Sequence, residues 1–459
     1  MARKRNTATA LQRRLRTGVR LLPLLVFAVL CYLQFRTISR FSPTVPCDDD
    51  SDTSRHAAMD DLLARLRESV TFLPLRDPRK RRAGEWFISA LNDTSEPAGE
   101  ARNIVLPSAA SSGRLLCVRA PPGTDAAYAL AWRDALPRGA ALRPGLTFVS
   151  EMSYDYRNLW HGLSALVPFA SWHARSGCRA VPARWALFHH GAAVRTGASA
   201  WLASLAEAAT GAEMAVETFP DAAADAGVPA CFEEAVVFRR QMEGLSRARL
   251  LAAFDFMRCK ARARCGVAPA TTPSPSPAAL RVTLVFRDGA RAFKDEAAVS
   301  RVFAAECARG AGPGGCAVAT ARAGNLTFCE QVALLSGTDV LVSAHGAQLA
   351  NMLFMDRGSS VMEFYPLGWR QRAGGGQFVY RWMADRAGMR HEGSWWDPHG
   401  DPCPGSPDIL SCYKDRKIGI DEAYFARWAA RVFAAAKERK ARRGGGKAFG
   451  EDAADCGCS

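Results

Sequence analysis

Short apolar runs alternate with helix-like stretches along the second half of the chain. Apolar runs of about four to eight residues are typical of strands buried on both faces, whereas apolar residues three or four positions apart indicate helices. The alternation therefore predicts a parallel, doubly wound sheet with right-handed crossovers. The predicted strands are 280–287, 316–320, 338–344 and 359–365, and the predicted helices are 294–308, 328–336, 348–354 and 421–443.

Residues 85–266 show a less regular pattern, in which short apolar runs mix with alanine-rich helical stretches such as 198–209. A proline- and serine-rich segment follows at 268–278 and is typical of an extended spacer. We therefore expect an α/β protein of two Rossmann-like lobes, with the active site in a cleft between them. The expected boundaries are an acceptor-side lobe at 85–267, a linker at 268–279, a second lobe with its closing helix at 280–443, and a flexible tail at 444–459.

The N-terminal region has the pattern of a membrane anchor followed by a stem. An apolar run at 21–35 follows a basic segment, 1–20, and we expect a membrane anchor at 21–37. Its core of about 15 residues is shorter than an average span of about 20, but flanking side chains can snorkel. No small-residue cleavage site follows, which favours an uncleaved signal anchor over a removed signal peptide or a soluble protein. The basic flank predicts a cytosolic tail, a stem at 38–84 and a luminal body.

Two charged runs lie within this predicted stem. Residues 79–82 read Arg-Lys-Arg-Arg, which is either a site for a basic-site protease or simply a solvated charge run. Residues 48–50 are three aspartates, but they lie away from both lobes, and the body contains no other Asp-x-Asp motif. We therefore expect no metal site.

The cysteines agree with a luminal body. Thirteen of the fourteen lie beyond the apolar run, and this many cysteines are typical of an oxidising compartment. None shows zinc-ligand spacing, so disulfides are expected, with Cys259–Cys265 and Cys403–Cys412 as plausible local loops. Two sequons, at Asn92 and Asn325, predict N-glycosylation.

A net charge of +15 first suggests nucleic-acid binding. Much of the excess, however, lies in residues 1–20 and 437–447, and no basic motif interleaved with aromatic residues occurs. We therefore exclude a nucleic-acid partner and expect the basic N-terminal segment to lie near anionic lipid headgroups.

Candidate binding residues gather at the carboxyl ends of the predicted strands in the second lobe. Arg287 ends the first strand, His345, Gly346 and Ala347 form the turn after the third, and Asn351 follows on the helix. Backbone N–H groups at such a turn and a guanidinium both attract a diphosphate. Glu363 lies near the end of the next strand, where ribose hydroxyls are commonly held. Each residue alone has a structural explanation, but together they predict a nucleotide-sugar site.

Candidate catalytic residues lie in the first lobe. His161 begins a predicted helix after Asp155, and it suits either a general base or a hydrogen-bonded helix-start residue. Glu233 precedes an apolar run and is a further carboxylate for the same cleft. Without a metal, the charge of a leaving group would be neutralised by Arg287, His345 and backbone dipoles.

These motifs resemble glycosyltransferase family 61, whose members include plant β-1,2-xylosyltransferases, xylan-decorating enzymes and O-linked GlcNAc transferases of the secretory pathway. The resemblance covers roughly residues 151–433. Its most specific part is the His345-Gly-Ala turn with the downstream segments 351–354 and 363–366, and Arg287 matches the phosphate-side arginine of the family. Residues 231–237 resemble its Cys-Phe-Glu strand, and 154–161 are most similar to the N-glycan core β-1,2-xylosyltransferase branch.

The resemblance implies a GT-B fold, an inverting mechanism, a UDP-sugar donor and no metal requirement. Many relatives carry an aspartate four residues after the equivalent of His161, and here that position is Ala165. If the aspartate normally takes the acceptor proton, another base is needed, and we consider His161, Asp155 and Glu233 in that order.

The expected function is therefore that of a type II Golgi glycosyltransferase that uses UDP-xylose and a glycan acceptor. Transfer of GlcNAc or a pentose to protein or cell-wall polysaccharide is the alternative, and the pocket around Trp369 and Arg370 would decide between them. A catalytically silent protein that binds nucleotide or glycan is a further alternative, motivated by Ala165. A hydrolase is a third alternative with little support, because no nucleophile elbow occurs and no acidic pair can be assigned across a cleft.

Overall fold

The computed structural model describes the strands and helices named below and part of the segments between them. The predicted cytosolic tail and anchor, the predicted stem apart from 71–74, and the spacer 268–278 lie outside the described residues. Within the described residues, no helix combines the length and the apolar character that crossing a membrane requires. The described residues are 71–74, 103–108, 111, 113–119, 127–132, 136, 139–152, 158–189, 192–193, 199–216, 229–238, 242, 245–267, 279–310, 315–369, 378–399, 403, 409–443, 456 and 458.

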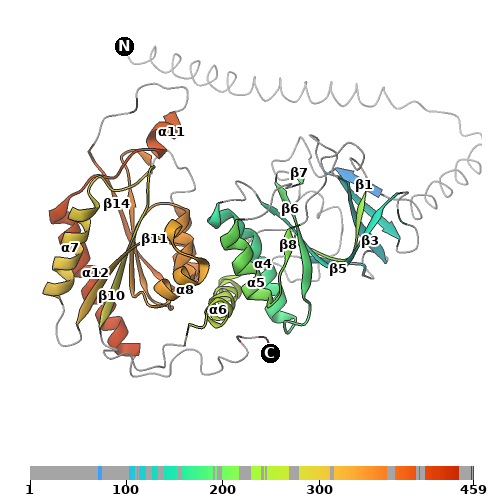
Figure 1. The fold of residues 1–459 in the computed structure, drawn as a ribbon, viewed down its shortest axis with the longest axis horizontal. Coiled ribbons are helices and arrows are strands. Elements are labelled where there is room, and N and C mark those ends of the chain that lie inside the picture. The colour runs from blue at the N-terminus through green and yellow to red at the C-terminus, as the bar shows by residue number, and fades with distance from the viewer. Residues whose placement is uncertain are drawn as a thin grey trace, which may run out of the picture. The chain divides into compact units, whose positions relative to one another are not determined.

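A mixed sheet is built from the described strands of the first half (Figure 1). The strands are β1 (Thr71–Pro74), β2 (Asn103–Leu106), β3 (Arg114–Arg119), β4 (Ala127–Trp132), β5 (Ala141–Met152), β6 (Pro182–His189), β7 (Ala192–Ala193), β8 (Ala215–Val216) and β9 (Ala230–Phe238). Their order is β1-β4-β3-β9-β5-β6-β7, with β2 also beside β9 and β8 beside β6. The β5–β9, β5–β6 and β6–β8 pairs are parallel, and the other pairs are antiparallel. This sheet therefore differs from a purely parallel Rossmann sheet.

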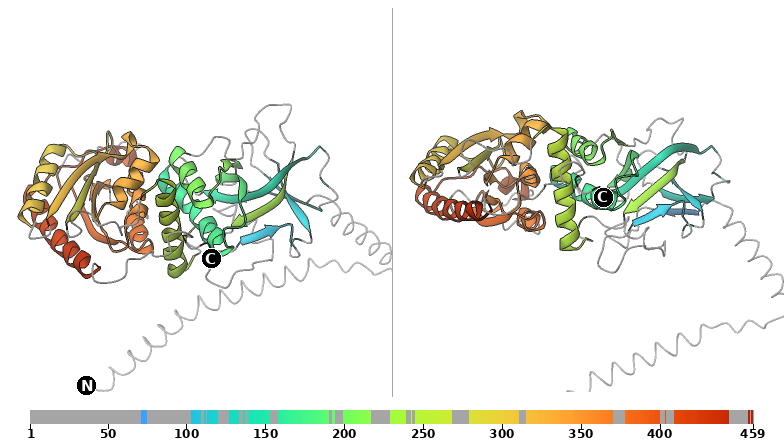
Figure 2. Two further views of the ribbon diagram at one scale, coloured as in Figure 1. Left: turned by 60° about the horizontal axis from the view of Figure 1, so that its bottom comes forward. Right: turned by 90° about the horizontal axis from the view of Figure 1, so that it is seen from below.

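Three helices of the first half pack against one another, and the first of them along the chain contacts β5 in the parallel part of this sheet (Figure 2). They are α4 (Leu159–Arg175), α5 (Ala200–Thr210) and α6 (Arg247–Arg264). Each follows a polar residue whose side chain accepts a hydrogen bond from a first-turn N–H, namely Asn158, Ser199 or Ser246. Such caps satisfy donors that a helix start leaves unpaired, and so they fix where each helix begins.

The second half contains the predicted parallel sheet. Its strands are β10 (Leu280–Phe286), β11 (Cys316–Arg322), β12 (Val340–Ala344), β13 (Ser360–Tyr365) and β14 (Arg390–Trp396), in the order β11-β10-β12-β13-β14. Every neighbouring pair is parallel. Strands β12 and β13 are buried at every position. This explains why the sequence shows them as continuous apolar runs, since both faces are covered.

Helices cover both faces of this second sheet, with α7 and α12 on one side and α8 on the other (Figure 1). The elements are α7 (Glu296–Arg309), η2 (Ala323–Asn325), α8 (Phe328–Ser336), η3 (Ala347–Phe354), α10 (Val379–Arg386), α11 (Ile409–Lys414) and α12 (Glu422–Arg443). The predicted helix at 348–354 forms as a 3-10 helix, η3. Strand β14 was not predicted, because its residues Arg-His-Glu-Gly-Ser-Trp-Trp lack an apolar run.

The apolar core continues from the helices of the first half to one face of the second sheet. A single cluster joins Leu166 of α4 and Phe254 of α6 to Leu341 of β12 and Phe354 of η3. Arg258 of α6 lies within this region, where burial lowers its pKa to about 10. Its Nε donates to the Leu353 carbonyl at 2.8 Å and its Nη2 to the Ala387 carbonyl at 3.0 Å. These bonds satisfy carbonyls at the ends of η3 and α10 and fix α6 against both elements.

Six disulfides join cysteines of the described residues. The predicted Cys403–Cys412 bridge is confirmed. The predicted Cys259–Cys265 bridge is wrong, because both residues belong to the α6 region, where a separation of about one and two-thirds helical turns points their side chains in different directions. The full set is Cys117–Cys231, Cys178–Cys458, Cys259–Cys456, Cys265–Cys329, Cys307–Cys316 and Cys403–Cys412.

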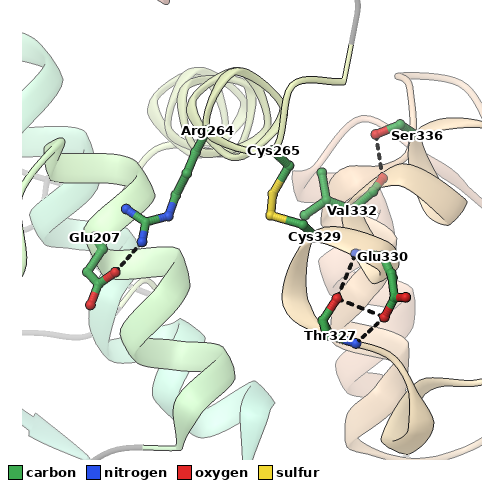
Figure 3. Close-up of a disulfide and its surroundings, with 8 residues drawn as sticks. All are labelled: Glu207, Arg264, Cys265, Thr327, Cys329, Glu330, Val332 and Ser336. Carbon is green, nitrogen blue, oxygen red and sulfur yellow. Dashed lines mark hydrogen bonds and ion pairs between the residues drawn. A yellow bond between two sulfur atoms is a disulfide. The ribbon is translucent and has the colours of Figure 1, made fainter.

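The Cys265–Cys329 bridge joins the end of α6 to the first turn of α8 (Figure 3). Next to it, Arg264 forms an ion pair with Glu207 of α5. Thr327 and Glu330 form a capping box, in which each side chain accepts a hydrogen bond from the other's backbone N–H. The start of α8 is therefore held both by its own cap and by a covalent bond to α6.

Candidate active site

The second sheet brings most of the predicted binding residues to one edge. Arg287 directly follows β10, His345 and Gly346 follow β12, and Glu363 lies within β13. Because neighbouring strands are parallel, their carboxyl ends meet at the same edge. Asp155, the second of the predicted catalytic residues, lies outside the described residues, as do Asn92 and Arg370.

The guanidinium of Arg287 lies over the turn after β12. Its Nη1 donates to the His345 carbonyl at 3.3 Å. Burial lowers the pKa of Arg287 from its usual value. Gly346 makes this approach possible, because a Cβ built on Gly346 would collide with Arg287 Nη1 and lie 2.6 Å from Gln348 Oε1. A glycine is therefore needed at this position because any larger residue would occupy the space that the side chains of Arg287 and Gln348 fill.

Glu363 is fully buried and holds two imidazoles. Its Oε1 lies 2.7 Å from His345 Nδ1, and its Oε2 lies 2.8 Å from His391 Nε2 and 3.4 Å from Ser394 Oγ. Burial alone raises the pKa of Glu363, but the hydrogen bonds and charges of the two histidines outweigh it and bring the pKa to about 2. An ionised carboxylate only accepts hydrogen bonds, so Nδ1 of His345 carries a proton and Nε2 is the ring atom left for other contacts.

In this geometry Glu363 binds His345 and His391, which differs from the predicted contact with ribose. Both of its oxygens accept hydrogen bonds from protein side chains, and none of its surface is exposed. Glu363 fixes the orientation of His345 at the sheet edge, and His391 supports it from β14.

Aromatic rings enclose the imidazole of His345. The ring stacks on Tyr365 at a centroid distance of 4.6 Å and meets the edge of Tyr380 at 5.3 Å. Burial, together with the charge of Glu363, raises the pKa of Tyr380, so its phenol stays neutral. Trp369 lies 6.5 Å from the same imidazole. The imidazole is therefore held in one orientation by packing as well as by Glu363.

Arg291 is a further cation of the site that the sequence analysis did not identify. Its backbone has a left-handed φ of 60°, and its guanidinium lies over the Trp369 ring at 5.7 Å. Burial, together with repulsion by the nearby charge of Arg287, lowers its pKa to about 10. Its position four residues after Arg287, in the turn at the same strand end, was the sequence signal that could have found it. His391 and Ser394 had no such signal, because β14 itself was not predicted.

The structure gives Asn351 a structural contact and places Ala347 at the start of η3. Asn351 Oδ1 accepts a hydrogen bond from Trp201 Nε1 of α5 at 2.8 Å, and both residues are buried. Ala347 is half-buried. Asn351 therefore ties η3 to α5, whereas Ala347 keeps surface next to the turn.

The predicted catalytic residues of the first half lie on other elements. His161 is half-buried in the first turn of α4, and its carbonyl accepts from Ser164 Oγ at 2.8 Å. Glu233 on β9 accepts from the Gly145 N–H at 2.9 Å. Ala165 is 1% exposed in the apolar core of α4. Their roles as acid–base groups stay predictions.

The described residues contain no group of three or more His, Cys, Asp and Glu side chains arranged to hold a metal ion. Asn325 is exposed at the end of η2, two residues before the capping threonine of α8. The predicted sequon is therefore accessible in this structure.

Comparison with known proteins identifies the family. A family model described as Glycosyltransferase 61 matches residues 132–362, which is half of the chain. The matched span begins at the end of β4 and runs through the β12 turn with His345 and Gly346, ending one residue before Glu363. No curated protein matches the chain. The family match together with the strand-edge residues shows that this chain belongs to glycosyltransferase family 61.

Proposed function

We propose that this glycosyltransferase moves a sugar from a UDP-sugar to a glycan acceptor with inversion and without a metal ion. The preferred donor is UDP-xylose and the preferred linkage is β-1,2. UDP-GlcNAc or a pentose donor, with protein or cell-wall polysaccharide as acceptor, is the alternative. The proposed location is the Golgi lumen, with residues 21–37 as the anchor.

One observation carries the proposal: the guanidinium of Arg287 is held against the His345 turn by a hydrogen bond to the His345 carbonyl. Arg291 lies close enough to Arg287 for the positive charge of Arg287 to lower the pKa of Arg291. Two neighbouring cations at the carboxyl edge of a parallel sheet suit the diphosphate of a nucleotide sugar. His345 follows the neighbouring strand β12, and because its Nδ1 is held by Glu363, its Nε2 is left for a further contact.

The reaction follows from these charges. The acceptor hydroxyl oxygen attacks the anomeric carbon from the face opposite UDP, and the bond from that carbon to the diphosphate oxygen breaks. UDP leaves with the bonding electrons, and Arg287 and His345 stabilise the negative charge that develops on it. A general base takes the hydroxyl proton, and His161, Asp155 and Glu233 are the candidates in that order.

A transfer assay tests the proposal directly. The full-length protein is incubated with UDP-xylose, UDP-GlcNAc and UDP-arabinose, each with N-glycan and xylan acceptors, and the release of UDP is measured. Arg287→Ala is expected to reduce turnover by about a hundredfold, since it removes a charged contact to the leaving group. Arg247→Ala is the matched control, because Arg247 is an exposed arginine that pairs with Asp385. Failure of every donor and acceptor pair contradicts the enzymatic proposal.

A catalytically silent binding protein is the second candidate, and the buried Ala165 favours it. In that case UDP raises the melting temperature without any transfer to an acceptor. Loss of this stabilisation in Arg287→Ala, with the Arg247→Ala control unchanged, then identifies a binding site without turnover.

A further inference from the structure

The site edge contains a group of buried hydrogen-bond donors without acceptors. The Nε atoms of Arg287, Arg291 and Arg416 and the indole Nε1 of Trp369 are buried, and none has a hydrogen-bond partner among the described residues. Trp369 is 8% exposed. Buried polar atoms are rarely left unpaired in native proteins, and each exception needs an explanation.

These donors belong to one neighbourhood. Arg291 lies over the Trp369 ring at 5.7 Å, and Arg287 is close enough to repel its charge. The Arg291 N–H donates to the Arg416 carbonyl at 2.8 Å, which brings the segment before α12 against the turn after β10. The guanidinium of Arg416 lies over the Tyr413 ring at 5.1 Å.

Tyr413 connects Arg416 back to Trp369. A Cβ on Gly368 would collide with the Tyr413 ring, so this ring packs directly on the residue before Trp369. The sequence thus places two donors after β10, one after β13 and one before α12, and the fold brings them together at a single edge.

The chemistry of the group selects its ligand. All four atoms donate and none accepts, so the matching ligand offers acceptors only. A sugar hydroxyl brings a donor of its own, whereas the oxygens of a phosphate are acceptors and carry the opposite charge. The acidic neighbours do not meet this demand: Glu363 holds His345 and His391, and Asp415 is exposed.

We propose that Arg291, Trp369 and Arg416 bind the second phosphate of the donor, so that the site takes a nucleoside diphosphate and rejects a monophosphate. This proposal rests on the proposed function, because Arg287 is taken to hold the first phosphate. Arg291 is the main determinant of this selectivity, and the Trp369 N–H adds a directional contact.

Binding of UDP, UMP and inorganic pyrophosphate to the full-length protein tests the proposal by calorimetry at one fixed ionic strength. Arg291→Gln is expected to weaken UDP and pyrophosphate by about tenfold and UMP by less than about twofold, because one charge-assisted contact is lost only for the second phosphate. Trp369→Phe keeps the ring beneath Arg291 but removes the N–H, and a loss of about threefold for UDP is expected. Arg416→Gln is expected to have an effect between these two.

Arg247→Gln is the matched control, since it removes one positive charge from an exposed position on α6. Thermal unfolding of each variant shows whether the fold is kept, and Trp369→Phe tests the proposal independently if Arg291→Gln does not fold. Equal weakening of UDP and UMP in Arg291→Gln, or unchanged UDP binding in both variants, overturns the proposal.

The outcomes separate this inference from the proposed function. A wild-type protein that binds UDP and UMP equally well contradicts the diphosphate selectivity and leaves the nucleotide-sugar donor intact. A wild-type protein that binds pyrophosphate but not UDP contradicts the nucleotide donor and supports the second-phosphate group. Binding of neither ligand overturns both.

Discussion

The two sheets differ in the solvent exposure of their strands. Strands β12 and β13 of the second sheet are buried at every position, between helices on both faces. Strand β5 of the first sheet is buried over 146–150, but its first five residues are partly or fully exposed, with Leu142 49% exposed. Of the residues at the candidate site, His345 follows β12 and Glu363 lies in β13, whereas Arg287 follows β10, which is buried except at Arg281. A sheet covered on both faces can thus place ionisable groups at a dry edge, where their interactions are strong.

The largest effect is expected from Glu363→Ala in the second sheet. The change leaves two buried imidazoles without their common acceptor, and a loss of about 3–5 kcal/mol in the free energy of unfolding is expected. Glu234→Ala on β9 is the matched change in the first sheet, and because Glu234 is exposed, its effect should stay within about 0.5 kcal/mol. Urea unfolding measures both. Similar losses would remove the contrast between the sheets.

The pH dependence of stability sharpens the same contrast. The folded-state pKa of Glu363 is about 2, below its ordinary value of 4.5. Its ionised form therefore stabilises the fold above pH 4.5, and this contribution is lost as the pH falls from about 4.5 to about 2. The shift corresponds to a contribution on the order of 3 kcal/mol. Urea unfolding between pH 7 and about pH 3 should show a shallower fall for Glu363→Gln than for the wild type. Equal slopes would show that Glu363 is not the group responsible.

The Cys265–Cys329 bridge is one of three bridges among the described residues that join the first half to residues after the spacer, and it is expected to contribute less than Glu363. Replacing both Cys265 and Cys329 with alanine should lower the free energy of unfolding by about 2–4 kcal/mol, since the bridge closes a long segment of chain. The Cys403→Ala/Cys412→Ala pair is the control, because its sequence separation is 9 rather than 64. Its effect should be smaller by about 1–2 kcal/mol if chain entropy dominates. Chemical denaturation without reductant compares the two, and equal losses would reject the entropic account.

A smaller effect is expected from Gly346→Ala at the edge of the second sheet. The added Cβ displaces the guanidinium of Arg287 and the amide of Gln348, so UDP should bind about tenfold more weakly with little change in melting temperature. Gly324→Ala is the control, since a Cβ there meets nothing within 4 Å. Calorimetry with UDP measures both variants. Unchanged binding in Gly346→Ala would show that the guanidinium position does not matter.

The smallest effect is expected from Leu142→Ala in the exposed part of β5. Removal of a half-exposed side chain should change the free energy of unfolding by no more than about 0.5 kcal/mol. Leu284→Ala on β10 is the matched change at a fully buried position and should cost about 2–5 kcal/mol. Urea unfolding compares the pair. A large loss in Leu142→Ala would mean that the first part of β5 is covered in solution.

The same contrast explains how much of the fold the sequence predicts. Strands β10, β12 and β13 of the second sheet were found to within two residues, because burial on both faces produces nearly uninterrupted apolar runs. Strand β11 was also found to within two residues, although none of its residues is buried. Strands β3 and β4, which pair antiparallel, were not predicted individually, since residues 85–266 show a less regular pattern. Strand β14 was missed because it is rich in polar residues, of which His391 and Ser394 lie within hydrogen-bond distance of Glu363. Distant disulfides such as Cys178–Cys458 cannot be read from spacing at all.

The candidate site follows a similar rule. Arg287, His345 and Glu363 were predicted because residues at the ends of parallel strands share an edge. Arg291, Tyr380 and His391 were missed because their proximity depends on a turn, a helix and an unpredicted strand. Glu363 was assigned to ribose because its burial and its two imidazole partners appear only once the strands are placed side by side.

The bridge from Cys265 to Cys329 spans the proline- and serine-rich spacer 268–278 in the sequence. A protease that cuts within this spacer divides the polypeptide into two pieces that stay attached through sulfur. On a denaturing gel without reductant the nicked protein runs as one species, and it separates into two bands only after thiol treatment. Purified material that looks intact under non-reducing conditions therefore has to be examined with reductant before its polypeptide is taken to be continuous.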